Sequence, residues 1–425
     1  MSEVKKVCII KSKRIPFMRS NTHYKGLSVR DLMVAPLRTL VSELKLEGKI
    51  LGEVALGAVN KHAYDFALAR ECVMDSGLSP ITPATDLQKA CGTSLEATIL
   101  VANKIALGQI ECGIAGGVDT NSDVPIEFTK KFSDRLLSLS NAKSMSAKLK
   151  AFKGFNPKEL LPTIPAIKEA RTGKSMGESC EEMAKTWSIS REDQDHLALE
   201  SQQRAATGYE KGFHDDLVME FKGKKVDGTF RPDTTIEKLS KLKPAFDKTS
   251  GNGTLTAGNS SAMTDGASCV FLCSEDYATK NNLEVLAHFK IGISTAVNYV
   301  KDEGLLMAPA YAVPKLLEMT DSTLQAFDFY EIHEAFAAQV LCTLAAWNSE
   351  DFCKGKLGRE EVLGEIDPTK MNINGGSLSL GHPFAATGTR IVGSLAKMIH
   401  ENGGGRGLIS ICTAGGMGIT AIIEK

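Results

Sequence analysis

Alternation between short apolar runs and helical segments constrains the fold of this chain more than any other feature of the sequence. Strands are expected at Val7–Ile10, at Gly52–Val59, just before Cys91 and at Cys112–Ala115, and helices at Val29–Leu46, Ala63–Asp75 and Leu95–Gly108. Strands that alternate with helices pack as layers around a common core. The first part of the chain therefore predicts an α/β fold.

The last third of the chain repeats this order of elements. The expected elements are a strand at Phe327–Ile332, a helix at Glu334–Trp347, a strand near Met371–Ile373, a helix at Ala385–His400, and a hairpin of Gly407–Cys412 and Ile419–Ile423. Both parts contain a strand that ends in a double glycine, in Cys112-Gly-Ile-Ala-Gly-Gly and in Cys412-Thr-Ala-Gly-Gly. Since 425 residues are too many for one simple core, this similarity indicates two duplicated halves packed together.

The middle of the chain differs in composition from both halves. Lys130–Lys174 holds eleven lysines and arginines, only three acids, and apolar residues among the bases. The α/β pattern resumes near Gly258, with a strand at Ser268–Leu272. We therefore expect three parts, which are an N-terminal half at 1–122 plus 252–280, an inserted loop domain at 123–251, and a C-terminal half at 281–425.

Composition and charge exclude several classes of protein. The net charge is -1, and no terminal tail carries a run of like charges, so nothing global indicates nucleic-acid binding. The apolar runs are far shorter than the ~20 residues that a membrane-spanning helix needs. The start, MSEVKKVCII, lacks the features of a secretory leader. The ten cysteines are therefore expected as free thiols in a reducing, cytoplasmic compartment.

Cys269 and Cys273 have a spacing that raises the question of a zinc site. A structural zinc site needs paired ligands, and this apolar run, ASCVFLC, has no second pair nearby. Buried strand cysteines are the favoured interpretation. No metal site is expected in this chain.

Cys91 is the first candidate catalytic residue. It lies in Gln88-Lys-Ala-Cys-Gly-Thr-Ser94, among small residues and directly before a long helix. The positive end of the helix dipole and the free N–H groups favour the thiolate, which is the reactive form of a cysteine. The structural alternative is a packed core cysteine.

Three residues of the last third are candidate partners of this thiol. His382 lies in a glycine-rich loop before Pro383 and a helix, where it could take the proton of a nearby cysteine. His333 begins a helix after a strand, in the position that Cys91 holds in the first half. Cys412 ends a strand before a glycine turn whose N–H groups could hold an oxyanion. Each residue alone has a structural alternative, as a hydrogen-bonded histidine or a buried cysteine.

Taken together and in this order, the motifs resemble those of the thiolase family along nearly the whole chain. The four blocks are Cys91-Gly-Thr-Ser94, His333-Glu-Ala-Phe336, Gly381-His-Pro383 and Cys412-Thr-Ala-Gly-Gly416. Further segments resemble the family's coenzyme A loop and loop domain, namely Thr256-Ala-Gly-Asn-Ser-Ser261 with Asp265-Gly-Ala, Arg231-Pro-Asp-Thr-Thr235 and Leu242-Lys-Pro-Ala-Phe246. The resemblance implies a duplicated five-layer αβαβα fold with an inserted helical loop domain.

Two positions depart from the usual family pattern. His333 stands where most thiolases have asparagine, which is typical of the branch that includes the β-subunits of the fatty-acid oxidation trifunctional complex. Ala414 replaces a glycine of the terminal block but still offers a backbone N–H. These departures shift the expected substrate away from a strictly four-carbon one.

The resemblance also implies an acyltransferase mechanism. His382 deprotonates Cys91, and the acyl group rests on Cys91 while coenzyme A leaves or arrives. Cys412 moves the second proton, to the acetyl-CoA enolate in cleavage or from acetyl-CoA in condensation. His333 and His382 are expected at the enolate oxygen, and the main-chain N–H groups of Cys91 and Ala414 at the tetrahedral intermediate. No separate cofactor is implied, because coenzyme A thioesters are the substrates.

Several substrate and partner contacts follow from the same resemblance. Ser261 is expected at the pantetheine arm and Arg231 at the nucleotide end, with Phe336 and Met176 as further coenzyme A contacts. A serine in a tight turn and a solvated arginine are the structural alternatives. A homodimer or homotetramer is expected. The basic segment is interpreted as a solvated cap near the coenzyme phosphates, or as a contact with a hydratase/dehydrogenase α-subunit or a membrane surface.

Three other functions compete with a 3-ketoacyl-CoA thiolase of fatty-acid β-oxidation. The first is a short-chain acetyl-CoA C-acetyltransferase specific for acetoacetyl-CoA. The second is a decarboxylating condensing enzyme of the ketoacyl synthase kind, which has no need for Cys412. The third is a scaffolding subunit, which the complete set of Cys91, His382 and Cys412 disfavours. A dinucleotide-binding function lacks its strand–GxGxxG–helix context.

Overall fold

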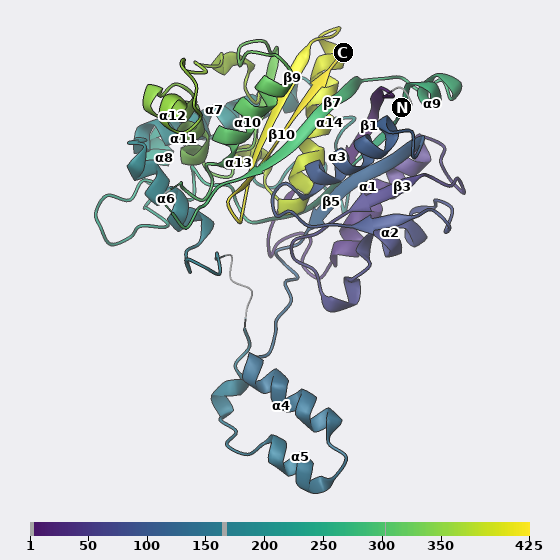
Figure 1. The fold of residues 1–425 in the computed structure, drawn as a ribbon, viewed down its shortest axis with the longest axis vertical. Coiled ribbons are helices and arrows are strands. Elements are labelled where there is room, and N and C mark those ends of the chain that lie inside the picture. Colours follow the sequence, from purple (N-terminus) through teal and green to yellow (C-terminus); the bar gives the residue numbers. More distant parts are fainter. Residues whose placement is uncertain (1–3, 164–167, 302) are drawn as a thin grey trace.

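A ten-stranded mixed sheet organises the chain, and the computed structural model describes residues 4–163, 168–301 and 303–425 (Figure 1). The strands are β1 (Val7–Arg14), β2 (Met18–Arg19), β3 (Glu53–Leu56), β4 (Ala84–Asp86), β5 (Cys112–Asp119), β6 (Thr264–Ser274), β7 (Ala287–Ala296), β8 (Phe329–Ile332), β9 (Arg406–Thr413) and β10 (Met417–Glu424). They are ordered β4-β3-β5-β6-β1-β7-β10-β9-β8, and β2 pairs with β6 beside this path.

The strand order is symmetric about the contact between β1 and β7, which confirms the predicted duplication. Parallel β3 and β5 correspond to parallel β8 and β9. Antiparallel pairs β5–β6 and β6–β1 correspond to β9–β10 and β10–β7. The strands of the two halves pair at one place, where Cys8 and Ile9 of β1 pair with His288 and Ala287 of β7, and the halves also pack through α3 and α14.

Helices cover both faces of each half and complete the five layers. They are α1 (Val29–Glu43), α2 (Leu68–Ser76), α3 (Thr93–Ala106), α10 (Ala308–Met319), α11 (Ala337–Trp347) and α14 (Thr387–Glu401). Because side chains alternate along a strand, Cys8 of β1 packs in the cluster of α1 and α2, whereas Ile9 packs in the cluster of α3 and α14. In β9, Ile409 belongs to the central cluster and Leu408 to that of α10 and α11. The layers are therefore α1/α2, strands, α3/α14, strands and α10/α11.

The segment between β5 and β6 has two differently placed parts. α6 (Met176–Thr186), α7 (Arg191–Glu210) and α8 (Ile236–Ser240) lie against the C-terminal half, where α6 and α7 contact α11. α4 (Lys130–Asn141) and α5 (Met145–Ala151) project away from the body (Figure 1). We call residues 127–163 the helical lobe, because Glu127 and Thr163 pair at its neck.

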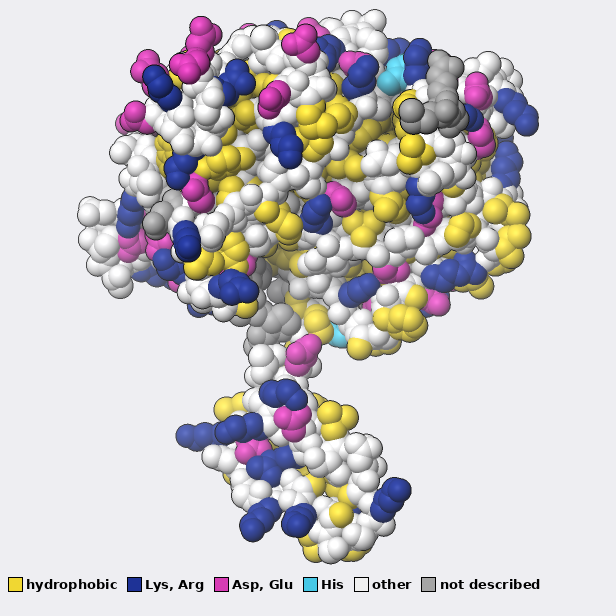
Figure 2. Space-filling model, viewed as in Figure 1, with side chains coloured by type: hydrophobic (Ala, Val, Ile, Leu, Met, Phe, Trp, Pro, Cys, Tyr) yellow, Lys and Arg dark blue, Asp and Glu magenta, His cyan; other side chains and the backbone are white. Residues whose placement is uncertain are grey.

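The helical lobe has its own small core. Phe132 lies edge-on to Phe128, with ring centroids 5.0 Å apart, and Phe155 packs beside it. Arg135 donates hydrogen bonds to Glu159 and to the carbonyl groups of Ala151, Lys153 and Gly154. Figure 2 shows lysines and arginines around the outside of the lobe, with apolar side chains between them.

Several expected element boundaries are wrong. β5 continues through Gly116 and Gly117 to Asp119, because these glycines leave room for neighbouring chain segments. Only an isolated bridge joins Met371 to Tyr330, so no strand forms at 371–373. Residues 63–75 form a 3₁₀ turn at Ala63–Asp65 and then α2, not one helix.

Two expectations about His333 are also wrong. α11 begins at Ala337, and residues 333–336 are not helical. The chain here pairs instead with the 259–261 loop, because the Ser261 N–H donates to the Ala335 carbonyl and the Ala337 N–H donates to the Asn259 carbonyl. The symmetric strand order equates α3 with α14. The His382 loop, and not His333, therefore corresponds to the Cys91 loop.

The remaining α-helices of the described residues are α9 (Glu275–Lys280), α12 (Glu350–Gly355) and α13 (Ser377–Leu380), and further 3₁₀ helices lie at Pro157–Leu160, Pro368–Lys370 and Phe384–Ala386. Within the described residues, no helix combines the length and apolar character needed to cross a membrane.

Candidate active site

Cys91 lies in a tight loop between β4 and α3. The Thr93 hydroxyl holds this loop, because it accepts from the Lys89 N–H at 2.8 Å and donates to the Ala90 carbonyl at 2.7 Å. Ala90 has a φ of 46°, a conformation that costs a non-glycine residue on the order of 1 kcal/mol. Of the ten cysteines, Cys91 alone is partly exposed. The loop thus presents a single accessible thiol.

His382 faces Cys91 from the loop before α14. Its Nε2 lies 3.2 Å from Cys91 Sγ, and its Nδ1 lies 2.5 Å from Thr387 Oγ1. The main-chain N–H of His382 donates to Thr264 Oγ1 at 2.9 Å. Gly381, with a φ of 97°, supplies the backbone conformation that turns the ring toward the thiol. This contact suits transfer of the thiol proton to imidazole.

Burial keeps both reacting groups uncharged at rest. Burial raises the pKa of Cys91 to about 12, although the backbone N–H groups of Ala414 and Cys91 oppose the shift. Burial, followed by the charge of Arg390, lowers the pKa of His382 to about 3. Backbone N–H groups favour the thiolate of Cys91, as expected, but desolvation outweighs them. Cys91 needs a base, and neutral His382 can act as one.

His333 lies beside His382, with ring centroids 4.2 Å apart. Its main-chain N–H donates to the Ser410 carbonyl of β9 at 2.8 Å, and its Nδ1 lies 2.8 Å from Ser377 Oγ. Burial, with repulsion from His382 and Arg390, holds its pKa well below the usual value. His333 is therefore a neutral group that can exchange hydrogen bonds with a substrate.

Cys412 lies next to the end of β9 and is 1% exposed. Burial, and then the nearby Cys91 sulfur, raise the pKa of Cys412 well above its usual value, so this thiol carries a proton at rest. The N–H groups of Cys91 and Ala414 both act on the Cys91 sulfur. The structure thus brings together all the residues predicted for catalysis, from both halves of the chain.

A cavity of about 710 Å³ contains two of the predicted coenzyme A contacts, Ser261 and Arg231. Arg19 and Lys238 line the same cavity, so three cationic side chains border it. The Arg231 N–H is anchored by Gln202 at 2.8 Å. A large cavity with several cations fits an elongated ligand that carries phosphates.

Phe336 and Met176 were predicted as coenzyme A contacts, but neither residue lines this cavity. Phe336 lies behind its wall, edge-on to the lining residue Phe246, with centroids 5.7 Å apart. Met176 lines a second cavity, of about 310 Å³, that also contains Ala414. Met263 lines both cavities, so they adjoin at this residue.

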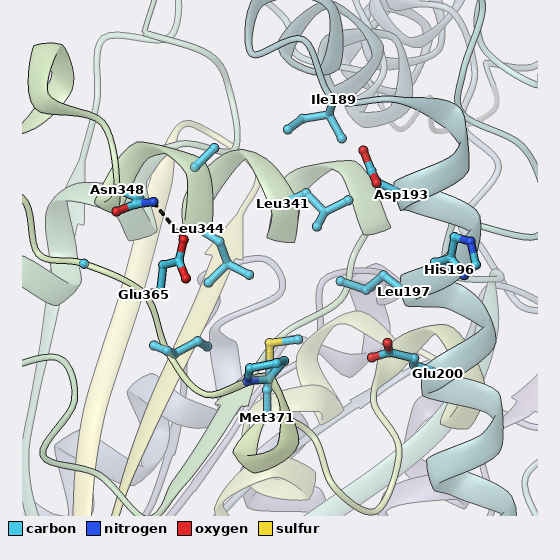
Figure 3. A pocket seen from close by; sticks show the side chains of 14 residues that line it. Ile189, Asp193, His196, Leu197, Glu200, Leu341, Leu344, Asn348, Glu365 and Met371 are labelled. Carbon is cyan, nitrogen blue, oxygen red and sulfur yellow. Dashed lines mark hydrogen bonds between the residues drawn. The ribbon is translucent and has the colours of Figure 1, made fainter.

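A further cavity, of about 550 Å³, lies between α7, α11 and the 364–371 segment (Figure 3). Leu197, Leu341 and Leu344 line it, together with the acids Asp193, Glu200 and Glu365 (Figure 3). None of the predicted site residues contributes to it.

The donor atoms of Cys91, His333 and His382 lie within 4.8 Å of one another, which is the one candidate group of metal ligands among the described residues. Sulfur and imidazole ligands would suit a soft cation. Cys91 Sγ already contacts His382 Nε2, and one further nitrogen of each histidine contacts a hydroxyl group, as a proton-transfer site requires. Cys269 and Cys273 lie in the buried core beside α1.

Sequence reasoning missed the residues that orient the catalytic side chains. Thr387 and Ser377 each contact one histidine, and Arg390 contacts Ser377. The carboxylate of buried Asp119 accepts N–H bonds from Asn60 and Ala385, which ties the 384–386 turn to β5. The only signal was the location of Ser377 and Thr387 in the glycine-rich block around His382.

The fold and this site define the class of protein. Residues 7–276 match the family model described as "Thiolase, N-terminal domain", and residues 284–425 match "Thiolase, C-terminal domain". The chain belongs to the thiolase family, and it is an enzyme of the acyltransferase class.

Individual relatives and solved structures agree with this assignment. The chain is 38% identical to a 3-ketoacyl-CoA thiolase of Shewanella putrefaciens over 427 aligned positions, which cover 99% of this chain and 97% of that protein. Human mitochondrial 3-ketoacyl-CoA thiolase in complex with CoA superposes with a TM-score of 0.81 at 27% identity, covering 99% of this chain and 98% of that one. The Bacillus anthracis acetyl-CoA acetyltransferase superposes with a TM-score of 0.82 at 28% identity, covering 100% of both chains.

Proposed function

We propose that this enzyme is a 3-ketoacyl-CoA thiolase, which cleaves 3-ketoacyl-CoA with coenzyme A to give acetyl-CoA and a shortened acyl-CoA. The observation that carries the proposal is the 3.2 Å contact between Cys91 Sγ and His382 Nε2, with a second buried thiol, Cys412, beside it. Relatives with this name cover nearly the whole chain. A decarboxylating condensing enzyme would leave the thiol of Cys412 without a role.

The first half of the reaction forms the acyl-enzyme. His382 takes the Cys91 proton, and the thiolate attacks the 3-keto carbon of the substrate. The bond between C2 and C3 breaks, and its electron pair forms the enolate of acetyl-CoA. Cys412 protonates the enolate carbon and becomes a thiolate. Acetyl-CoA then leaves, and the acyl group remains on Cys91.

The second half transfers the acyl group to coenzyme A. The Cys412 thiolate takes the proton of the incoming thiol, which attacks the thioester carbon. Cys91 leaves as a thiolate and recovers its proton from His382. His333 and His382 hydrogen-bond the enolate oxygen, and the N–H groups of Cys91 and Ala414 hold the tetrahedral intermediate. Coenzyme A thioesters are the only small molecules that this scheme uses.

We assign the two ends of the substrate to the two adjoining cavities. We place coenzyme A in the larger cavity, with its phosphates near Arg231 and Lys238 and its pantetheine arm at Ser261. We place the acyl chain in the smaller cavity, where Met176 and Phe384 are among the apolar lining residues next to Ala414. The apolar side chains of this cavity favour chains longer than four carbons, although Asn60, Asn121, Lys168 and Glu169 also line it. His333 in place of asparagine agrees with the branch that contains trifunctional-complex β-subunits.

The helical lobe is, in this proposal, a docking surface of a homo-oligomeric, cytoplasmic enzyme of β-oxidation. Leu137, Met145 and Leu149 are each more than half exposed among lysines. Basic residues interleaved with apolar ones suit an anionic membrane or a hydratase/dehydrogenase α-subunit. Its distance from the body leaves little role as a cap over coenzyme A (Figure 1).

Thiolysis of 3-ketoacyl-CoA substrates of four to sixteen carbons tests the proposed function. We expect kcat/KM to rise beyond four carbons. Met176→Trp fills the smaller cavity and should reverse this order, while sparing the four-carbon substrate. Activity restricted to acetoacetyl-CoA would favour a short-chain enzyme, and activity that requires a malonyl donor would favour a decarboxylating one.

A further inference from the structure

His333 has one ring nitrogen engaged and one free. Nδ1 lies 2.8 Å from Ser377 Oγ, whereas Nε2 is buried and has no hydrogen-bond partner among the described residues. Nε2 is therefore the atom available to a ligand. Whether it donates or accepts depends on which nitrogen carries the proton, and the neighbours of Ser377 determine this.

Arg390 restricts the role of the Ser377 hydroxyl. Its Nη2 lies 2.8 Å from Ser377 Oγ, and a guanidinium group can only donate hydrogen bonds. The Ser377 oxygen therefore accepts from Arg390. Its one proton has a single acceptor within reach, His333 Nδ1, because no other side-chain or backbone group of the described residues forms a hydrogen bond with this hydroxyl.

The opposite arrangement would leave two buried groups unpaired. If Nδ1 of His333 carried the proton, Ser377 would accept from both neighbours and its own proton would have no acceptor. Nε2 of His333 would then carry a lone pair that accepts no hydrogen bond. Unpaired buried polar groups cost free energy. The pairing therefore favours Ser377 donating to Nδ1, with the ring proton on Nε2.

We infer that Arg390 and Ser377 are positioning residues that hold His333 in the Nε2–H tautomer, so that it donates a hydrogen bond to the substrate oxygen. Glu331 fixes Arg390 in turn, with Oε2 3.3 Å from Nη1, and both side chains are at most 2% exposed. The positive charge of Arg390 also opposes protonation of His333. This role in the reaction rests on the proposed function, but the tautomer itself does not.

His382 requires the opposite tautomer. As a base it must accept the Cys91 proton at Nε2, so its own proton lies on Nδ1 and is donated to Thr387 Oγ1. The two neighbouring rings thus have different hydroxyl partners and different roles. Ser377 makes its ring a donor toward the substrate, and Thr387 makes the other ring an acceptor toward Cys91.

Nitrogen NMR of the ¹⁵N-histidine-labelled enzyme tests the tautomer directly in the resting state. His333→Asn identifies the His333 signals. We expect a protonated Nε2 and an unprotonated Nδ1 in the wild type. Ser377→Ala should give an averaged or reversed pattern and lower kcat for thiolysis by roughly tenfold to a hundredfold, with little change in KM. Arg390→Lys keeps the positive charge but cannot contact Glu331 and Ser377 through two nitrogens of one planar group. This variant should show signals of both His333 tautomers.

Matched variants distinguish the loss of the hydrogen bond that positions His333 from a general loss of packing in α13. Ser377→Thr keeps the hydroxyl and should restore the wild-type pattern and most of kcat. Ser379→Ala removes a buried hydroxyl of the same short helix, which contacts Ser201 and Gly376 but not His333, and should change neither readout. An unchanged tautomer in Ser377→Ala, or an equal effect of Ser379→Ala, would overturn the inference. Absence of thiolysis in the wild type would overturn the proposed function alone.

Discussion

At the scale of single residues, catalysis depends on a neutral thiol in contact with a neutral imidazole. Cys91 and His382 do not form a resting thiolate–imidazolium pair, because burial raises the pKa of the thiol and lowers the pKa of the ring. At neutral pH, Cys91 of the empty site is therefore almost entirely the thiol. This protects an accessible cysteine from reaction in the empty site.

The pH dependence of alkylation tests this state. Below a raised pKa of about 12, the thiolate fraction of Cys91 grows with pH. We expect alkylation by iodoacetamide in the substrate-free enzyme to accelerate about tenfold per pH unit from about pH 6 to 9, without a plateau. Mass spectrometry of the Cys91 peptide is the measurement. A plateau at or below pH 8 would indicate an ion pair instead.

The catalytic residues were predictable from the sequence, but their orienting partners were not. Cys91, His382 and Cys412 lie in glycine-bounded blocks whose composition marks a strained or exposed loop. Ser377 and Arg390 act only through tertiary contacts, since Arg390 reaches Glu331 on another element. A serine or an arginine in a helix carries no local pattern that distinguishes such a role.

At the scale of elements, short apolar runs predicted most of the strands, and helical periodicity predicted α1, α2, α3, α11 and α14, whereas a double glycine was an unreliable marker of a strand end. The double glycine of Cys112-Gly-Ile-Ala-Gly-Gly predicts that β5 ends there. Gly117 instead lies inside the strand, where a Cβ would lie 2.0 Å from the Ala385 carbonyl oxygen. The same pair in the second half, Gly415 and Gly416, does form a turn, with φ values of 78° and 69°. Only neighbouring chain segments distinguish these two uses of glycine.

Gly117→Ala is therefore expected to be strongly destabilising. The added methyl group meets backbone atoms, which cannot rotate away, so the free energy of unfolding should fall by at least about 2 kcal/mol. Chemical denaturation measures it. Gly355→Ala, at the end of α12 with no atom near the added Cβ, is the control and should change stability by less than about 1 kcal/mol. Equal stability of the two variants would contradict this account of β5.

At the scale of the whole molecule, the duplication creates the site. Cys91 and His382 occupy corresponding loops before α3 and α14, and the central layer brings these loops face to face. The strand order of the structure revealed this relation, whereas the sequence had suggested His333 as the counterpart of Cys91. The helical lobe has no counterpart in the second half, so its function lies outside the shared fold.

Charge removal on the lobe tests its docking role. Four exposed lysines are changed to glutamine, namely Lys131, Lys148, Lys150 and Lys153. At about 1 kcal/mol per lysine, affinity for anionic vesicles should fall at least a hundredfold, with thiolysis unchanged. Four exposed body lysines serve as the control, namely Lys25, Lys49, Lys211 and Lys280.

Vesicle flotation and pull-down with a hydratase/dehydrogenase subunit distinguish the two occupants. Loss of vesicle binding identifies a membrane contact, and loss of subunit binding identifies a partner contact. No binding by the unmodified enzyme, or equal binding by the lobe and body variants, would contradict a docking role.

Mapping the acyl-enzyme tests the central claim most directly. The enzyme is mixed with a 3-ketoacyl-CoA in the absence of free coenzyme A, quenched in acid, digested and analysed by mass spectrometry. We expect the shortened acyl group on the peptide that contains Cys91, and none in Cys91→Ala. Acylation of Cys412, or an acylated Cys91→Ala enzyme, would contradict the account.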